Sequence, residues 1–197
     1  MKHFVSFEGI DGSGKSTVSK LVEQKLKDKG FDVVLTAEPT ESVVGRFVQQ
    51  CIRQNADPSV TSFAFIADRM QHCKKISEWL EQGKIVLCDR FSESTYAYQA
   101  VQLQDVVRDP VEWLKRIGEG RVLIPQRTFL FDVSSKEAMS RICSREELVP
   151  FEKVEFLKEV RQKYLQICKG PRFLVLDSTE SVESLVNRCC SDILEEK

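Results

Sequence analysis

The stretch Gly9-Ile10-Asp11-Gly12-Ser13-Gly14-Lys15-Ser16-Thr17 fits the pattern G-x-x-x-x-G-K-[ST] and directly follows the apolar run Phe4 to Phe7. Its three glycines let the backbone adopt positive φ angles and turn N–H groups inward, which forms a nest for phosphate oxygens. The helix that follows adds the positive end of its dipole. Lys15 is long enough to reach the β- and γ-phosphates, and the Ser16 hydroxyl is a ligand for Mg²⁺. We therefore interpret the stretch as a nucleoside triphosphate site, in preference to a glycine-rich hairpin turn.

Length and composition limit the class of protein. With 197 residues, 42% of them apolar, the chain is the size of one domain, and we expect a single domain over residues 1–197. The 29 basic and 30 acidic residues nearly cancel, which disfavours binding to nucleic acid or to a membrane surface. The seven cysteines are odd in number and include no C-x-x-C pair, which argues against a disulfide framework or a zinc site. We expect no signal peptide, no membrane span and a cytoplasmic location.

Short apolar runs alternate with helical patterns, which indicates β-α units and a parallel sheet covered on both faces. This pattern predicts an α/β fold with five strands. The expected strands are 3–8, 33–37, 85–88, 128–132 and 173–177. The expected helices are 15–29, 43–53, 61–82, 94–103, 110–117, 135–144, 152–168 and 182–194.

Three charged residues follow the ends of expected strands, where ligands bind in open α/β sheets. Asp89 is a candidate second ligand for Mg²⁺, through water, beside Ser16; alternatively it caps the next helix. Arg90 is a candidate to bridge phosphates and to neutralise charge as the γ-phosphoryl moves. Asp11 would repel phosphates, so we expect it to face a sugar hydroxyl or the metal; alternatively it is a turn residue bonded to its own backbone.

One expected helix carries a possible base site. Phe65 and Arg69 are four residues apart, so the ring and the guanidinium lie on the same face and could stack on a planar base and donate to its carbonyl. Phe65 fits core packing equally well. His72 has no metal-ligand partner at a useful spacing, so a structural or surface position is its default and it receives no role.

Arg141 and Arg145 are four residues apart and run from a helix end into the charged loop 145–151. A basic loop over a phosphate site has the properties of a lid, which excludes water and adds positive charge when it closes. The alternative is a solvated helix end with arginine at its negative pole.

The chemistry of the acceptor is also limited by composition. An alcohol acceptor needs a base for its proton, and the chain shows no Ser-His or Cys-His arrangement. A nucleoside monophosphate, with a second pKa of roughly 6, is already an anion at pH 7. Arginines and glycines suit phosphate-to-phosphate transfer, where catalysis is mainly positioning and charge neutralisation.

Four segments, GIDGSGKST, FAFIADRMQH, CDRFSESTYAYQ and REELVPFE followed by FLKEVRQKYLQI, resemble the thymidylate kinase family over nearly the whole chain. The resemblance implies a three-layer P-loop kinase fold, strand order 2-3-1-4-5, and a lid loop near residues 144–152. It implies transfer of the ATP γ-phosphate to dTMP in dTTP biosynthesis, dependence on Mg²⁺, and a homodimer. The alternatives are a kinase for another nucleoside monophosphate or a deoxynucleoside, or a catalytically weak nucleotide-binding paralogue.

The resemblance also implies roles for residues at matching motif positions. Phe65 would stack on thymine, Arg69 would bond its O4, and Arg90 would grip the acceptor phosphate. Tyr98 would crowd the C2′ position and so favour deoxyribose. The implied dTMP-binding set is Asp11, Glu38, Pro39, Phe65, Arg69, Arg90, Ser94, Thr95, Tyr98 and Gln99. The implied catalytic set is Lys15, Arg90, Arg145, Arg141 and Asp11, with residues 9–17 binding ATP and with Ser16 and Asp89 at the metal.

The chain departs from the family's pattern near the acceptor site. Phe91 stands where the usual D-R-Y has its tyrosine. Ala37 replaces the arginine of the common R-E-P-G loop, an arginine that often helps to hold the acceptor, and Arg46 is a candidate replacement.

A second departure concerns the lid, where Val149-Pro150 stands at the place of the usual Asp-Arg pair. Because Ser13 puts no basic side chain in the phosphate loop, the resemblance implies that a lid arginine serves the transition state. Arg145 is the first choice for this role and Arg141 the second.

Overall fold

The structure is a computed structural model that describes residues 1–143 and 151–195. Its middle layer is a five-stranded sheet with the order β2-β3-β1-β4-β5, and every neighbouring pair of strands is parallel. The predicted α/β fold and strand order are therefore confirmed. The strands are β1 (Phe4–Glu8), β2 (Val33–Ala37), β3 (Ile85–Asp89), β4 (Arg127–Asp132) and β5 (Phe173–Asp177).

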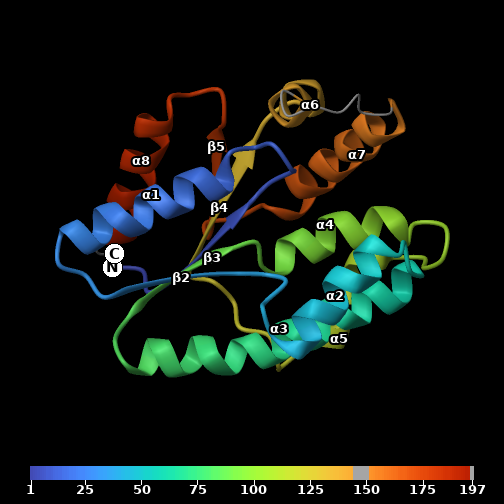
Figure 1. The fold of residues 1–197 in the computed structure, drawn as a ribbon, viewed down its shortest axis with the longest axis horizontal. Helices are drawn as coiled ribbons and strands as arrows, with labels where there is room; N and C mark the ends of the chain where they lie inside the picture. Colours follow the sequence, from blue (N-terminus) through green and yellow to red (C-terminus); the bar gives the residue numbers. More distant parts are fainter. Residues whose placement is uncertain (144–150, 196–197) are drawn as a thin grey trace.

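Helices cover both faces of this sheet (Figure 1). Helices α1 (Lys15–Asp28) and α8 (Val182–Leu194) pack together on one face. The other helices lie toward the opposite face and the edge at which the strands end. They are α2 (Val43–Arg53), α3 (Pro58–Glu81), α4 (Ser92–Gln102), α5 (Pro110–Gly118), α6 (Ser135–Cys143) and α7 (Phe151–Ile167).

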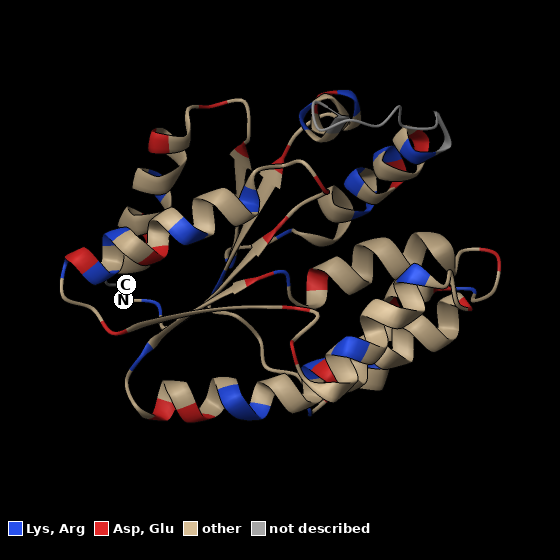
Figure 2. Ribbon diagram, viewed as in Figure 1, with Lys and Arg blue, Asp and Glu red and all other residues tan. Residues whose placement is uncertain are grey.

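Strand β1 is buried along its whole length and shows how the two faces divide the core. Val5 and Phe7 point into the cluster under α1 and α8, whereas Phe4 points into the cluster under α3. Successive side chains of a strand alternate between faces, so a strand covered on both sides reads as a continuous apolar run. Basic and acidic positions are interspersed along the outer helices α1 and α3 (Figure 2).

The largest difference from the predicted boundaries is at the start of α3, which begins at Pro58 and not at residue 61. The Asp57 carboxylate accepts hydrogen bonds from the amides of Ser59 and Val60, and a proline in the first turn needs no amide partner. Helix α4 likewise begins two residues early, at Ser92. The remaining ends agree to within one residue among the described segments.

The phosphate loop joins β1 to α1 at the edge where the strands end. Gly9, Gly12 and Gly14 have φ angles of 145°, 81° and 82°, so the predicted positive-φ turn is confirmed. A Cβ at Gly12 would lie 2.2 Å from the carbonyl oxygen of Ala138, so this position requires glycine on two counts.

Two further expectations concern the lid and membrane spans. The expected lid, 144–152, lies largely outside the described residues, and Arg145 lies there with it. None of the helices within 1–143 and 151–195 is both long and apolar enough to cross a bilayer.

Candidate active site

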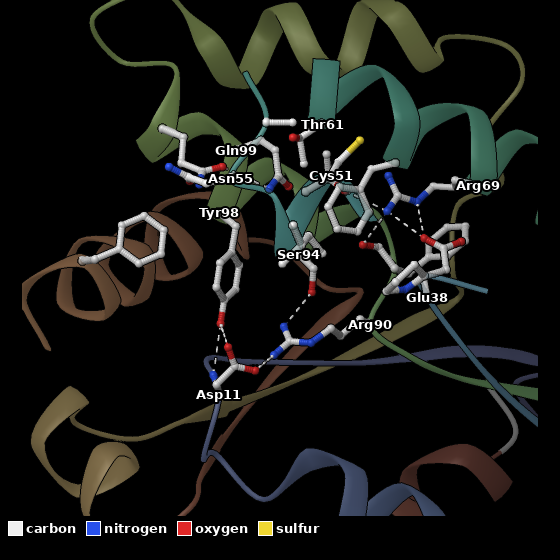
Figure 3. A pocket seen from close by; sticks show the side chains of 18 residues that line it. Asp11, Glu38, Cys51, Asn55, Thr61, Arg69, Arg90, Ser94, Tyr98 and Gln99 are labelled. Carbon is white, nitrogen blue, oxygen red and sulfur yellow. Dashed lines mark hydrogen bonds and ion pairs between the residues drawn. The ribbon is translucent and has the colours of Figure 1, made fainter. Parts of the chain in front are cut away.

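A cavity of about 340 Å³ opens beside the phosphate loop, at the edge of the sheet where the strands end (Figure 3). Its walls come from the loops after β1, β2 and β3 and from helices α2, α3, α4 and α7. All ten residues of the implied dTMP-binding set line it. The cavity is also lined by eight residues that the sequence did not single out for binding, namely Cys51, Ile52, Asn55, Ala56, Thr61, Phe91, Gln102 and Phe156.

Phe65 lies both against the core and at the cavity. Its ring packs against the small core cluster of Val48, Cys51 and Ala64, and it also lines the cavity. Helical spacing brings Arg69, one turn later, to the same cavity, as expected from the four-residue interval.

Arg69 is held rigidly in the cavity wall, with only 1% of its surface exposed. Its Nε donates to Glu38 Oε2 at 2.8 Å, and its Nη2 donates to the Phe91 carbonyl at 3.0 Å and to Thr95 Oγ1 at 2.9 Å. The guanidinium also lies over the Phe91 ring, 5.3 Å from its centroid. Such a fixed fork donates in a defined direction, which suits recognition of one edge of a planar ligand.

Glu38 lines the cavity but both of its carboxylate oxygens are already engaged. Oε2 accepts from Arg69, and Oε1 lies 2.9 Å from His72 Nδ1. Glu38 therefore acts on the cavity mainly by orienting Arg69. His72, which the sequence left without a role, is buried and not at the surface.

Arg90 lies between the phosphate loop and the cavity, with a left-handed backbone at φ 66°. Its Nη1 donates to the Gly9 carbonyl and to Ser94 Oγ, each at 3.1 Å, and its Nη2 donates to Asp11 Oδ1 at 2.5 Å. The guanidinium also lies over the Tyr98 ring, 5.2 Å from its centroid. Arg90 thus contacts the phosphate loop and also lines the cavity.

The Asp11 carboxylate faces the cavity, as Figure 3 shows, and does not simply close its own turn. Oδ1 accepts from Arg90, and the Tyr98 hydroxyl donates to Oδ2 at 3.2 Å. Partial desolvation favours the neutral carboxyl, but the positive charges of Arg90 and Lys15 lower the pKa of Asp11 below its ordinary value. The carboxylate therefore stays ionised beside Arg90.

Glu8 is a functional candidate that the sequence reasoning missed. It is fully buried at the end of β1, where Oε1 accepts from the Phe91 amide at 2.7 Å and Oε2 accepts from Ser94 Oγ at 2.6 Å and from the Tyr164 hydroxyl at 3.1 Å. Burial, reinforced by the nearby Glu93, raises the pKa of Glu8 to about 7. The place of Glu8, one residue before the glycine loop, does not reveal these contacts in the sequence, because its partners come from the loop after β3, from α4 and from α7.

The donor side of the phosphate loop holds polar atoms without partners. Among the described residues, the buried Ser13 Oγ and Asp89 Oδ1 make no hydrogen bond. The side chain of Asp89 does not cap α4, whose N-cap residue is Phe91 and which lacks a side-chain cap bond. Burial and the charge of Arg90 lower the pKa of Lys15 to about 8, so bound phosphate would restore its full positive charge.

The residues present suit a bound Mg²⁺ ion. The orphaned Asp89 Oδ1 is the oxygen ligand that this ion prefers, and Ser16 exposes its hydroxyl at the start of α1. No group of three or more His, Cys, Asp or Glu side chains in residues 1–143 and 151–195 is arranged to hold a metal by itself. A site of one or two protein ligands completed by phosphate oxygens is the usual arrangement for Mg²⁺.

The two arginines considered for the lid differ in what is described. Arg141 Nη2 donates to Glu137 Oε1 at 2.7 Å and to the Ser178 carbonyl at 2.9 Å, and Nη1 reaches the Gly12 carbonyl at 3.5 Å. Arg141 therefore lies against the phosphate loop. Arg145 lies outside the described residues.

Arg46 does not take the place of the family's arginine at position 37. Its side chain is exposed, donates to the Glu41 carbonyl at 2.6 Å, and does not line the cavity. Position alone suggested this residue, because it follows the same loop, but α2 directs it away from the cavity.

Comparison with a family model and with individual known proteins gives the same family in each case. The family model described as thymidylate kinase matches residues 7–189. The probable thymidylate kinases of Methanosarcina acetivorans and Methanosarcina mazei are 37% and 38% identical over 195 residues, which cover 97% of this chain and 95% of each relative. The probable thymidylate kinase of Sulfurisphaera tokodaii is 36% identical over 188 residues, covering 95% of this chain and 94% of that protein.

Proposed function

The chain belongs to the thymidylate kinase family, and we infer from this that it transfers the γ-phosphate of ATP to dTMP, giving dTDP and ADP. The observation that carries the inference, beside the family, is the position of Arg90 between the phosphate loop and the cavity. One guanidinium there can meet the acceptor phosphate on one side and the donor on the other.

For the acceptor, we propose that the base lies between Phe65 and the fixed guanidinium of Arg69, which donates to O4. Thr95 and Gln99 line the same end of the cavity. Tyr98 and Asp11 are bonded to one another where the sugar would lie, which leaves little room for a 2′-hydroxyl. Ser94 supports Arg90, and Glu38 supports Arg69.

For the donor, we propose that residues 9–17 wrap the phosphates of ATP, with Lys15 on the β- and γ-phosphates. Ser16 and Asp89 would hold Mg²⁺, which supplies charge neutralisation between the phosphates when bound. Arg141 lies against the Gly12 carbonyl, and we propose that Arg145 joins it at the transition state when the lid closes.

The chemistry that this chain's residues supply is positioning and charge. Two anionic nucleotides repel one another, and Arg90, Lys15 and the lid arginines offset that repulsion along the line of transfer. The acceptor phosphate needs no general base, because its oxygen is already an anion at neutral pH. The ion pair of Asp11 with Arg90 holds the guanidinium in place before the acceptor arrives.

We also propose that residues 1–197 act as one domain in a cytoplasmic homodimer. Apolar side chains are exposed on α2 and α3, where Phe47 and Phe63 are 48% and 51% exposed. A second copy would cover such a face. The cytoplasmic location rests on the six described cysteines, which are free thiols.

The decisive experiment measures ADP formation from Mg·ATP in a coupled assay with a panel of acceptors: dTMP, dUMP, dCMP, ribonucleoside monophosphates and thymidine. We expect dTMP to give the highest kcat/KM. Protein that binds ATP yet forms no ADP in the presence of dTMP contradicts the proposal. A higher kcat/KM for thymidine would instead identify a deoxynucleoside kinase.

A further inference from the structure

His72 is a buried histidine with two side-chain partners and no contact with the cavity. It lies on α3, 4% exposed, with Nδ1 2.9 Å from Glu38 Oε1 and Nε2 2.8 Å from Thr36 Oγ1. The Glu38 carboxylate can only accept, so Nδ1 must carry a hydrogen. The ring is therefore oriented by strand β2 on one side and by Glu38 on the other.

These contacts form a continuous chain into the nucleotide cavity. Thr36 contacts His72, His72 donates to one oxygen of Glu38, and the other oxygen of Glu38 accepts from Arg69 Nε at 2.8 Å. Arg69 lines the cavity and His72 does not. His72 is thus one layer behind the group that meets the ligand.

The rest of the loop is held by α3 in the same way. Asp68 accepts from the Thr40 amide at 2.7 Å, from Thr40 Oγ1 at 2.6 Å and from Ser42 Oγ at 3.0 Å. With Asp68 fixing residues 40–42, the remaining freedom of Glu38 is the rotation of its carboxylate about its own side chain. The bond from His72 removes that freedom, because it fixes the oxygen that Arg69 does not hold.

We propose that His72 is a positioning residue for acceptor recognition, which sets the direction in which Arg69 donates into the cavity by fixing the plane of the Glu38 carboxylate. This rests on the proposed function in taking dTMP as the acceptor. A buried carboxylate oxygen without a donor is costly, so loss of the His72 bond would let Glu38 turn and carry Arg69 with it. Binding of the base, and the choice between bases, would then weaken without a change on the ATP side.

Two polar replacements of similar size separate the two bonds of the ring. In His72→Asn, the amide nitrogen occupies the place of Nδ1 and keeps the bond to Glu38. In His72→Gln, the amide reaches the place of Nε2 and keeps the bond to Thr36 instead. Since both variants introduce an amide at the same buried position, general destabilisation affects both, whereas only His72→Gln loses the donor to Glu38.

We expect His72→Gln to raise the KM for dTMP about tenfold, as loss of a hydrogen bond to a charged group does, with kcat and the KM for ATP within twofold of wild type. The preference for dTMP over dCMP, which carries an amino group in place of O4, should shrink by a similar factor. His72→Asn should stay within threefold of wild type in both. Calorimetric titration with dTMP in the absence of ATP gives the same comparison without catalysis.

A purely structural role predicts a different pattern. Equal KM values for dTMP in the two folded variants, a larger effect in His72→Asn, or a matching rise in the KM for ATP would each overturn the inference. If neither variant folds, Thr36→Val and Glu38→Gln carry the test, and a Glu38→Gln variant with an unchanged dTMP to dCMP preference overturns it. Wild-type protein that does not phosphorylate dTMP contradicts the proposed function, and it is identified before any variant is measured.

Discussion

The acceptor wall is the part of the cavity wall around Arg69 and Glu38, and the donor side of the phosphate loop is the part around Ser13 and Asp89. The two differ in whether their buried polar groups have hydrogen-bond partners. In the wall, Arg69 is 1% exposed and is bonded to Glu38, Phe91 and Thr95. On the donor side, Ser13 Oγ and Asp89 Oδ1 are buried without a partner among the described residues. The protein itself completes one half of the site, and it leaves the other half to be completed by what binds there.

This difference separates two sources of binding free energy. A guanidinium already held in place loses little freedom when a ligand arrives, so the wall contributes selectivity. An unpaired buried oxygen costs about 1–3 kcal/mol until a ligand satisfies it, so the donor side gains most from binding. Mutations on the two sides should therefore change different measured quantities.

Arg90 should show the largest effect, because it contacts both sides. We expect Arg90→Ala to lower kcat/KM for dTMP about 10³- to 10⁴-fold, since a charged fork that meets both phosphates is lost. Arg90→Lys keeps the charge without the fork and should recover part of this loss. Steady-state kinetics check both variants, and activity within tenfold of wild type for Arg90→Ala would remove Arg90 from its proposed place.

Asp89 tests the donor side alone. We expect Asp89→Asn to lower kcat by about 10²- to 10³-fold, because the orphaned carboxylate oxygen would no longer attract the cation between the phosphates. The Mg²⁺ concentration for half-maximal activity should rise, while dTMP binding measured by calorimetry stays unchanged. A variant with an unaltered Mg²⁺ titration would contradict the assigned metal site.

A variant of Glu8 tests whether this buried carboxyl group titrates at a raised pH in the folded protein. Its pKa of about 7 in the folded protein is above the usual 4.5, so the native state binds more protons than the unfolded state between these values. The free energy of unfolding should therefore fall as the pH rises from about 4.5 to 7, by roughly 3 kcal/mol from this group.

Glu8→Gln cannot titrate and should lack this component. Urea denaturation of both proteins at pH 5 and pH 8 measures it as the difference between their two changes, in which groups that do not interact with Glu8 cancel. Identical pH dependence in the two proteins would show that the carboxyl of Glu8 titrates at its ordinary pH.

The smallest expected difference in the free energy of unfolding is between two variants at matched glycines of the phosphate loop. Gly12 and Gly14 have nearly the same φ, but a Cβ at Gly12 would lie 2.2 Å from the Ala138 carbonyl, whereas a Cβ at Gly14 has nothing within 4 Å. Both substitutions carry the cost of a left-handed residue, roughly 1–2 kcal/mol, and only Gly12→Ala adds a clash.

We expect Gly12→Ala to unfold more easily than Gly14→Ala by about 2 kcal/mol in urea and to lose ATP binding while it keeps dTMP binding. Equal stabilities in the two variants would mean that α6 moves freely away from the loop. Loss of dTMP binding would mean that the two sides are coupled through the loop.

Local sequence patterns predicted those parts of the fold that depend on neighbouring residues. The glycine loop, the five strands and the pairing of Phe65 with Arg69 on one helix face all follow from spacing within one segment. The structure places the start of α3 at Pro58, where Asp57 and Pro58 form the same kind of cap as Asp109 and Pro110 at the start of α5. The predicted start at residue 61 leaves out this cap and the first turn that follows it.

Buried polar partners could not be predicted in this way. Glu8 meets Tyr164 across 156 positions of sequence, and His72 meets Glu38 across 34. Neither residue lies in a pattern whose period reveals its partner, since the contacts arise only when strands and helices from separate segments pack together. The resemblance named ten residues that line the cavity, including Glu38 and Ser94, and it left out Glu8 and His72, which lie behind them.

The bonds of Asp68, Arg69 and His72 to residues 38–42 have a consequence for the size of ligand that the protein admits. A wall held by several hydrogen bonds cannot move outward without breaking them together, so it does not widen for a larger ring system. We expect the stiffness of the wall by itself to exclude purine nucleotides, apart from any mismatch of hydrogen-bond donors and acceptors.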